Sequence, residues 1–226
     1  GRGTLLTHAG ELLDGGLVRL IEARVADVPE FATKRFAHGV FDFRFYRIVI
    51  YALVRSLRPR VFVETGILHG LTSLFILEAL ERNGSGTLIS ADLPSYPESG
   101  PANRDGCHAV LPRGREPGWV VPSAKAGRWR PLIGRSVEVL PPVLETLDGI
   151  DVFCHDSEHT YQTMWDELEL GWRSLRKGGV LICDNIDMSG AFFDFAADRG
   201  CRFIALSPCD SAYLETVRFA IAIKDD

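Results

Sequence analysis

The sequence predicts an α/β protein built on a doubly wound, mostly parallel, seven-stranded sheet. From Arg60 onward, short β-rich runs alternate with stretches of helical periodicity, the pattern of consecutive strand–helix–strand units. The last two strands are joined only by Pro208–Ser211, too short for a crossover helix, so we expect an antiparallel C-terminal hairpin. We expect strands at 60–64, 86–91, 131–134, 150–154, 179–183, 202–207 and 214–223, and helices at 70–83, 136–147, 161–176 and 189–199.

Composition limits the kinds of partner. The net charge of −5 argues against nucleic-acid binding, which needs a cationic surface. No apolar run reaches the roughly 18 residues that cross a bilayer, and the N-terminus has no signal-peptide pattern. The five cysteines form no CxxC pair, which is typical of a reducing compartment. We therefore expect a cytoplasmic protein with no membrane partner.

The region before the first strand is expected to be helical. Residues 1–58 form an N-terminal helical cap on a domain of residues 59–226, with helical spacing over 5–28 and 41–57. The apolar faces of these helices have two alternative roles, which the sequence leaves open. They form a homodimer contact, or they pack into the core against the sheet.

Residues 94–130 interrupt the alternation of strands and helices. This segment holds six prolines and many glycines, has no clear period, and carries several basic residues in its second half near Trp119 and Trp129. Long irregular segments in compact domains are usually functional loops or disordered. We interpret it as a lid that recognises an anionic or aromatic substrate, with a solvated surface loop as the alternative.

Acidic and amide side chains follow two consecutive strands. Asp156 and His159 come after the strand at 150–154, and the pair Asp184-Asn185 follows the strand at 179–183. Parallel strands joined by a helix place their C-terminal ends side by side, in the crevice where such sheets bind ligands. Three oxygen side chains beside an imidazole suit a hard divalent cation with a base next to it.

Each of these residues also has a purely structural interpretation. Asp184 and Asn185 are good helix caps for a helix near Met188, and Asp156 is a good cap for the helix at Tyr161. His159 is equally compatible with an ordinary hydrogen-bonded histidine. His155 directly precedes Asp156 and is expected to point to the other side, outside the catalytic set.

A glycine turn follows the first strand. In the run from Glu64 to Ser73, Gly66 permits a tight turn, and Gly70 is expected to let the backbone approach a ligand closely. The next strand ends in Asp92, which is placed to accept hydrogen bonds from ribose hydroxyls. The two glycines are four residues apart and do not form GxGxxG, which disfavours a dinucleotide and an NAD-linked oxidoreductase.

These motifs resemble those of the class I S-adenosylmethionine-dependent methyltransferases. The E-x-G-x-x-x-G pattern is similar to their first motif, Asp92 to their ribose-binding acid, and 133–136 to the segment that lines the adenine. The resemblance covers roughly 58–224 and implies a Rossmann-like fold with an antiparallel seventh strand. The cofactor-binding residues implied by it are Glu64, Gly66, Gly70, Thr72, Asp92, Ser136 and Asp156.

A narrower resemblance is to metal-dependent O-methyltransferases of small molecules, including catechol and natural-product sugar types. Asp156, Asp184 and Asn185 match the metal-binding positions of that subset, which implies a divalent metal such as Mg²⁺. The D-x-x-H-x-Y run from Asp156 to Tyr161 resembles the sugar branch, which implies His159 and Asp156 as catalytic residues. The implied partner is a hydroxylated small-molecule acceptor in natural-product biosynthesis.

Two other functions share this fold and these motifs. Cephalosporin-hydroxylase-like proteins have similar sequence patterns, and a non-catalytic protein that keeps the nucleoside pocket would retain the glycine turn. The fold by itself does not choose among them.

Overall fold

The computed structural model describes residues 2–26, 28, 45–96, 104–105, 110–207 and 218–225. They form one seven-stranded sheet in the order β3-β2-β1-β4-β5-β7-β6. All neighbouring strands are parallel except β7, which is antiparallel to both β5 and β6. The predicted doubly wound sheet with an antiparallel C-terminal hairpin is therefore confirmed. The strands are β1 (Val61–Thr65), β2 (Thr87–Asp92), β3 (Trp129–Ile133), β4 (Ile150–His155), β5 (Leu175–Cys183), β6 (Phe203–Leu206) and β7 (Phe219–Ile223).

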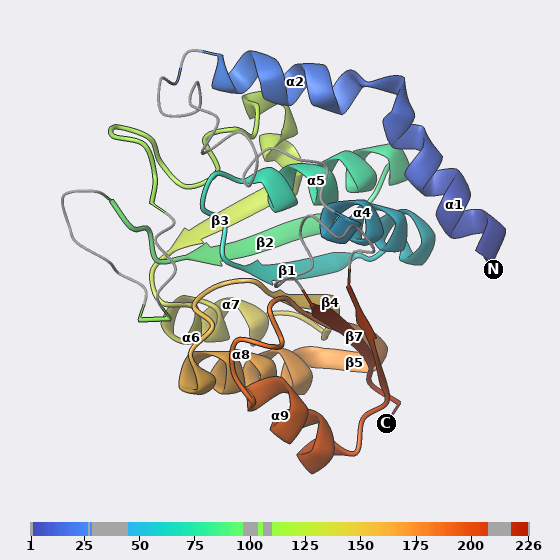
Figure 1. The fold of residues 1–226 in the computed structure, drawn as a ribbon, viewed down its shortest axis with the longest axis vertical. Coiled ribbons are helices and arrows are strands. Elements are labelled where there is room, and N and C mark those ends of the chain that lie inside the picture. Colours follow the sequence, from blue (N-terminus) through green and yellow to red (C-terminus); the bar gives the residue numbers. More distant parts are fainter. Residues whose placement is uncertain are drawn as a thin grey trace.

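Helices cover both faces of the sheet and bury a hydrophobic core on each (Figure 1). Phe62 of β1 faces the core beneath the first helical layer, and Phe153 of β4 faces the core beneath the second. No helix in the described ranges is both long and apolar enough to span a bilayer. The first layer contains α4 (Phe45–Leu57) and α5 (Leu71–Asn83), and the second contains α6 (Ser136–Val139), α7 (Pro141–Leu144), α8 (Tyr161–Ser174) and α9 (Ala191–Arg199).

The N-terminal residues add helices to the first layer. The expected helix over 5–28 is split into α1 (Arg2–Gly10), the 3₁₀ turn η1 (Glu11–Asp14) and α2 (Gly16–Val25). The break falls at Gly15, whose φ of +69° is accessible to glycine. Leu12, Leu17 and Ile21 are buried in the core on the α5 side, which is the packing role left open by the sequence.

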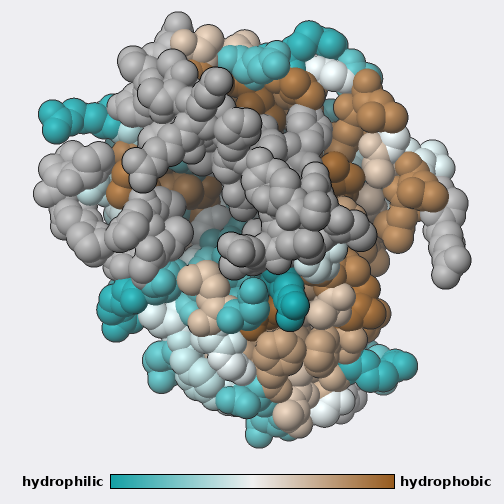
Figure 2. Space-filling model, viewed as in Figure 1, coloured by the Kyte–Doolittle hydropathy of each residue, from teal (hydrophilic) through white to brown (hydrophobic). Residues whose placement is uncertain are grey.

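Other apolar residues of this N-terminal segment remain on the surface. Leu6 is 75% exposed and Leu13 is 88% exposed. Figure 2 shows hydrophobic side chains on the outer surface where α1 and η1 run. A homodimer contact through these helices stays a prediction.

Glu11 attaches the N-terminal helices to α4. Its carboxylate accepts hydrogen bonds from the Tyr51 hydroxyl at 2.6 Å and from Arg55 Nε at 2.7 Å. The hydrogen bond from Arg55 is the largest influence on the Glu11 carboxyl and holds its pKa well below the usual value, outweighing the opposing effect of burial. The charged form is therefore the one that the folded state stabilises.

We expect Glu11→Gln to lower the free energy of unfolding by about 1–2 kcal/mol at pH 7, because a charged acceptor is lost. Glu22→Gln, a change at an exposed position of α2, is the control and should have no effect. A depressed pKa stabilises above the unfolded value near 4.5, and this contribution is lost as the pH falls through the folded pKa. Urea unfolding at several pH values should thus show that the difference in free energy of unfolding between the wild type and Glu11→Gln becomes smaller in acid. A difference that does not depend on pH would contradict the stabilising role of the charged Glu11.

Several elements depart from their predicted bounds. The helix expected over 136–147 is two short helices, because Pro141 has no N–H to continue the backbone ladder across Leu140. Strand β5 begins at Leu175, four residues before the predicted start at 179, and contains an irregularity in its pairing with β4. The strand expected from 214 begins at Phe219, and 214–217 lie outside the described residues.

The second half of the 94–130 segment is folded against the first layer. The Gly118 N–H donates to the Leu68 carbonyl at 2.8 Å, and the Val120 N–H donates to the His69 carbonyl at 3.1 Å. The short helix η3 (Ser123–Arg128) follows, and its Lys125 pairs with two glutamates of α5. This part of the segment is therefore attached to the loop after β1, and its role as a lid stays a prediction.

Candidate active site

The loop after β1 touches the turn after β4, and a glycine is needed where they meet. Gly66 has a φ of +86°, and its N–H donates to the Ala91 carbonyl at 2.9 Å. A Cβ on Gly66 would lie 1.8 Å from the Asp156 carbonyl oxygen. The predicted tight turn is present. It brings the loop after β1 (residues 66–70, the glycine loop) directly against the turn after β4 (residues 156–160, the acidic turn).

Asp92 holds the shape of the glycine loop. Its Oδ2 accepts the backbone N–H groups of Ile67 and Leu68, each at 2.6 Å. Leu68 has a φ of +47°, an uncommon conformation for a leucine. Burial raises the pKa of Asp92, although the two backbone hydrogen bonds act in the opposite direction. Asp92 lies at the position predicted for an acceptor of the ribose hydrogen bonds. It also stabilises the backbone of the loop after β1, a role that the sequence did not suggest.

Glu64 is a buried carboxylate at the end of β1. Its Oε1 accepts hydrogen bonds from the Ser73 and Ser90 hydroxyls. Its Oε2 is buried without a hydrogen-bond partner among the described residues. Burial raises the pKa of Glu64 to about 7. A buried carboxylate oxygen that lacks a donor at the ligand edge of the sheet suits a donor supplied by a ligand.

Gly70 has a packing role that was not predicted. It starts α5 with a φ of +86°, but a Cβ there would lie 2.6 Å from the Gly118 Cα. Gly70 is thus required for the close approach of the chain's own 118 segment, and its approach to a ligand stays a prediction. Thr72, two residues further on, is buried and accepts a hydrogen bond from Arg47 Nε at 3.4 Å.

His159 is buried among polar partners. Its backbone N–H donates to Asp105 Oδ2 at 2.8 Å, and its Nδ1 lies 3.2 Å from the same oxygen. A carboxylate only accepts, so we assign the proton to Nδ1; Nε2 then accepts from the Asn185 amide at 3.2 Å. Burial, with a smaller effect of His155, lowers the pKa of His159 to about 4. Its ring is neutral at pH 7, as a base must be.

Two carboxylates lie beside this histidine. Asp156 Oδ1 is 4.0 Å from His159 Nε2. Burial raises the pKa of Asp156 well above its usual value, and the negative charge of Asp184 adds to the effect. Asn185 next to them has a φ of +50°, a conformation that asparagine tolerates better than most residues. The structure therefore brings the predicted residues Asp156, Asp184, Asn185 and His159 together at one edge of the sheet.

These oxygen donors suit a hard cation. In the described ranges, no group of three or more histidine, cysteine, aspartate and glutamate side chains could hold a metal ion. The predicted set instead combines two carboxylates with one amide, which are the ligand types that Mg²⁺ takes. The negative charges of Asp156 and Asp184 repel each other, and a bound cation would offset this repulsion. The residues present therefore fit a divalent cation.

The helix-capping interpretations of the acidic residues are wrong. Helix α8 is capped by Thr160, whose side chain accepts the Thr163 N–H. Helix α9 begins later than expected, after Gly190, and has no side-chain cap. Asp156, Asp184 and Asn185 are therefore not committed to capping either helix.

Glu167 is the centre of a polar cluster that was not predicted from the sequence. Its buried carboxylate accepts hydrogen bonds from Thr65 at the end of β1, from Ser136 at the start of α6, and from Ser157 in the acidic turn. Ser136, predicted to bind the cofactor, is thus held by α8. Glu167 shares the inward face of α8 with Met164 and Leu168, and a glutamate at such spacing is the signal that could have revealed it.

His155 lies in the site and not on its far side as predicted. Its Nδ1 is 2.6 Å from Glu167 Oε2, and its ring meets the His159 ring edge-on at a centroid distance of 5.5 Å. The expectation assumed strand alternation through Asp156. Strand β4 ends at His155, so the alternation ends there too.

The fold and the site define a class I methyltransferase, the class predicted by the E-x-G-x-x-x-G motif. A protein family described as a methyltransferase domain matches residues 63–186, which is more than half of the chain. The chain belongs to this methyltransferase family. No curated protein matches the sequence.

Solved structures have the same fold. A putative O-methyltransferase from Klebsiella pneumoniae is 16% identical, with a TM-score of 0.63 over 92% of this chain and 90% of that one. The O-methyltransferase TomG from Streptomyces achromogenes, in complex with S-adenosylmethionine, is 16% identical, with a TM-score of 0.59 over 92% and 90%. An O-methyltransferase from Bacillus cereus, in complex with S-adenosylhomocysteine, is 14% identical, with a TM-score of 0.59 over 92% and 90%.

Proposed function

We propose that this protein transfers a methyl group from S-adenosylmethionine to a hydroxyl of a small molecule. The observation that carries the proposal is the contact between Gly66 and the Asp156 backbone, which joins the cofactor loop to the acidic turn. A cofactor on the loop would therefore lie beside His159. The solved neighbours from Streptomyces achromogenes and Bacillus cereus, which hold S-adenosylmethionine and S-adenosylhomocysteine, support this assignment.

The cofactor would lie along the C-terminal ends of β1 and β2. Glu64 Oε2 offers a carboxylate oxygen for the cofactor's ammonium group, and Asp92 stands at the end of β2 for the ribose hydroxyls. Ser136 begins α6 after β3, at the segment expected to line the adenine. These three positions follow the sheet from its centre toward its β3 edge.

His159 is the residue that we propose as general base. Asp105 fixes the ring with the lone pair of Nε2 directed at the Asn185 amide. An acceptor hydroxyl that displaces this amide would donate its proton to Nε2. The acceptor oxygen then attacks the sulfonium methyl in line, the C–S bond breaks, and its electron pair stays on sulfur. Holding the two reactants in contact supplies much of the acceleration.

Asp156, Asp184 and Asn185 are the residues that would hold a divalent cation such as Mg²⁺. Bound there, the cation would supply positive charge that lowers the pKa of the acceptor hydroxyl and offsets the repulsion between the carboxylates. Catalytic assistance by Asp156 is thus proposed through this charge and through its position beside His159.

The biological setting is also a proposal. TomG is involved in tomaymycin synthesis, which supports a natural-product acceptor for this chain. Cys154, Cys183 and Cys201 are free cysteines, which suits the reducing cytoplasm expected from the sequence.

The experiment that tests the function is calorimetric titration with S-adenosylhomocysteine, with Mg²⁺ and again with EDTA, followed by methyl-transfer assays on hydroxylated acceptors. We expect micromolar cofactor binding in both conditions and acceptor methylation that falls when EDTA is present. Absence of cofactor binding in both conditions would overturn the methyltransferase proposal. If the cofactor binds and acceptor methylation is insensitive to EDTA, only the proposed role of the divalent cation would be overturned.

We expect His159→Gln to lower kcat by about 10²–10⁴-fold while the affinity for S-adenosylhomocysteine stays within about threefold, because the base acts on the acceptor. His8→Gln, on the N-terminal helix α1, is the control and should leave kcat unchanged. A His159→Gln variant with wild-type kcat would remove the general-base role.

A further inference from the structure

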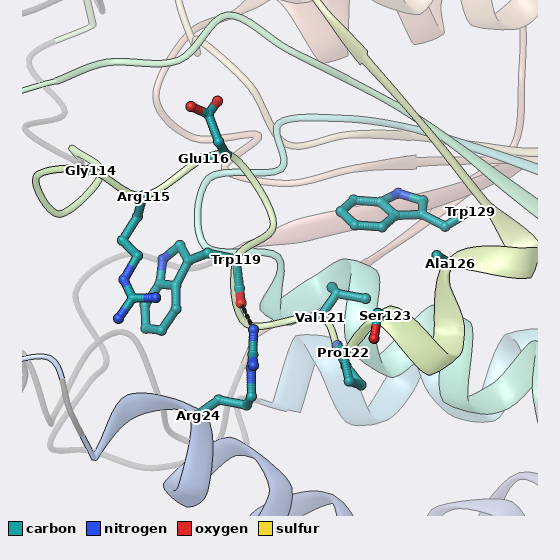
Figure 3. Close-up of a pocket in the computed structure, with 10 residues that line it drawn as sticks. All are labelled: Arg24, Gly114, Arg115, Glu116, Trp119, Val121, Pro122, Ser123, Ala126 and Trp129. Atoms are coloured by element: carbon teal, nitrogen blue, oxygen red, sulfur yellow. Dashed lines mark hydrogen bonds between the residues drawn. The ribbon is translucent and has the colours of Figure 1, made fainter.

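A cavity of about 420 Å³ lies on the α5 side of the sheet, outside the acidic site. It is bounded by the 114–122 segment, by η3 and the first residue of β3, and by the end of α2. Figure 3 shows Trp119 and Trp129 on opposite sides, with Arg24 reaching up from α2. The volume is in the range of small-molecule sites. The partly buried indole of Trp129 suits a flat ligand, whereas Trp119 is only 8% exposed and contributes one edge of the wall.

The cavity is lined by two arginines, Arg24 and Arg115. Arg24 Nη2 donates to the Trp119 carbonyl at 2.5 Å, and the Arg115 guanidinium lies 5.1 Å from the centre of the Trp119 ring. Neither guanidinium has a carboxylate partner in the described part of the chain. Glu116 also lines the cavity, but its side chain extends away from Arg24 in Figure 3. Lys125, by contrast, is paired with Glu78 and Glu81.

Both tryptophans are linked by hydrogen bonds, directly or through Ser90, to the segment that contains the glycine loop, which we propose binds the cofactor. Trp119 Nε1 donates to Nδ1 of the buried His69 at 3.0 Å. Trp129 Nε1 donates to Ser90 Oγ at 2.8 Å, and Ser90 Oγ donates to Glu64 Oε1 at 2.7 Å. The walls of the cavity are therefore hydrogen-bonded to the two ends of the segment from Glu64 to His69.

We propose that this cavity is a regulatory site for a planar aromatic carboxylate, and that its occupancy changes the affinity for the methyl donor. The aromatic ring lies against the partly buried Trp129 indole, and the carboxylate pairs with Arg24 or Arg115. Ligand contacts shift Trp119 and Trp129, and their hydrogen bonds transmit the shift to the cofactor loop. The coupling rests on the proposed function, whereas the binding of the carboxylate does not.

The first arm of the test measures binding without cofactor. Calorimetric titration compares indole-3-acetate with the uncharged indole-3-acetamide, and we expect the acid to bind at least about tenfold more tightly. Arg115→Gln should weaken binding of the acid at least fivefold, while Arg113→Gln, an exposed change outside the lining, should leave it unaltered. Equal affinity for acid and amide, or equal loss in both variants, would overturn the site.

The second arm measures coupling. Saturating indole-3-acetate should change the dissociation constant of S-adenosylhomocysteine at least threefold, and saturating S-adenosylhomocysteine should change that of indole-3-acetate by the same factor. Trp129→Phe keeps an aromatic wall but loses the donor to Ser90, so it should bind the acid within about twofold and reduce the coupling. If indole-3-acetate leaves the dissociation constant of S-adenosylhomocysteine unchanged in the wild type, the proposed regulation of methyl-donor binding would be overturned. If S-adenosylhomocysteine itself does not bind, the proposed function falls while the first arm still decides the cavity.

Discussion

Gly66→Ala is expected to lower the affinity for S-adenosylhomocysteine at least about 100-fold, which corresponds to about 2.7 kcal/mol. The new Cβ would stand 1.8 Å from the Asp156 carbonyl oxygen, and both atoms belong to the backbone or are fixed to it. The glycine loop and the acidic turn would have to separate to admit the methyl group. Calorimetry with S-adenosylhomocysteine, together with the unfolding midpoint in urea, would measure the effect.

Gly84→Ala is a matched control for this substitution. Gly84 has a φ of +73°, close to that of Gly66, but a Cβ there meets nothing within 4 Å. The control therefore carries the cost of the left-handed backbone, about 1 kcal/mol, without the steric collision. If both variants lost the same affinity and stability, the contact between the two turns would not matter.

Glu167→Gln is expected to lower the free energy of unfolding by about 3 kcal/mol and to weaken cofactor binding as well. The carboxylate accepts from hydroxyls on three different segments and from His155, and an amide turns one acceptor oxygen into a donor that faces them. Because Ser136 and Thr65 flank the expected cofactor position, loosening them should raise the dissociation constant of S-adenosylhomocysteine. Urea unfolding and calorimetry on the same preparation would measure both effects.

Asp166→Asn is the neighbouring control, since Asp166 accepts a hydrogen bond from Gln162 of the same helix at 2.8 Å and has no other side-chain hydrogen bond within the described part of the chain. We expect changes within about 0.5 kcal/mol there. The pKa of Glu167 predicts how the stability difference between the wild type and Glu167→Gln depends on pH. Burial acts to raise it, but the hydrogen bond and charge of His155 bring it below the usual 4.5. The stabilisation is then present above pH 4.5 and lost as the pH falls further, so the two proteins should converge in acid. A small effect at neutral pH would contradict a central role.

Much of the fold could be predicted from the sequence because its signals are local. Strand and helix periodicity marks the alternation, and the short connection before β7 implies the antiparallel hairpin. The meeting of Asp156 with Asp184 and Asn185 follows from one topological rule, that parallel strands align their C-terminal ends. The helix over 136–147 was predicted as unbroken, although Pro141 within it removes a backbone donor and could have indicated the break.

The features that were missed depend on contacts between distant segments. Asp92 braces the backbone of Ile67 and Leu68, and Gly70 accommodates Gly118; periodicity reports neither partner. His155 was placed wrongly because side-chain alternation holds only inside a strand, and β4 ends at that residue. Glu167 was the exception, since its place on the apolar face of α8 was visible in the sequence.

The position of β7 has a consequence for synthesis on the ribosome. This strand comes last of the seven in the chain but lies inside the sheet, between β5 and β6. While the chain is being translated, the outer edge of β5 has no partner until residues 219–223 emerge, so an open strand edge is presented to neighbouring nascent chains. Binding of a chaperone or rapid pairing with β7 would cover this edge.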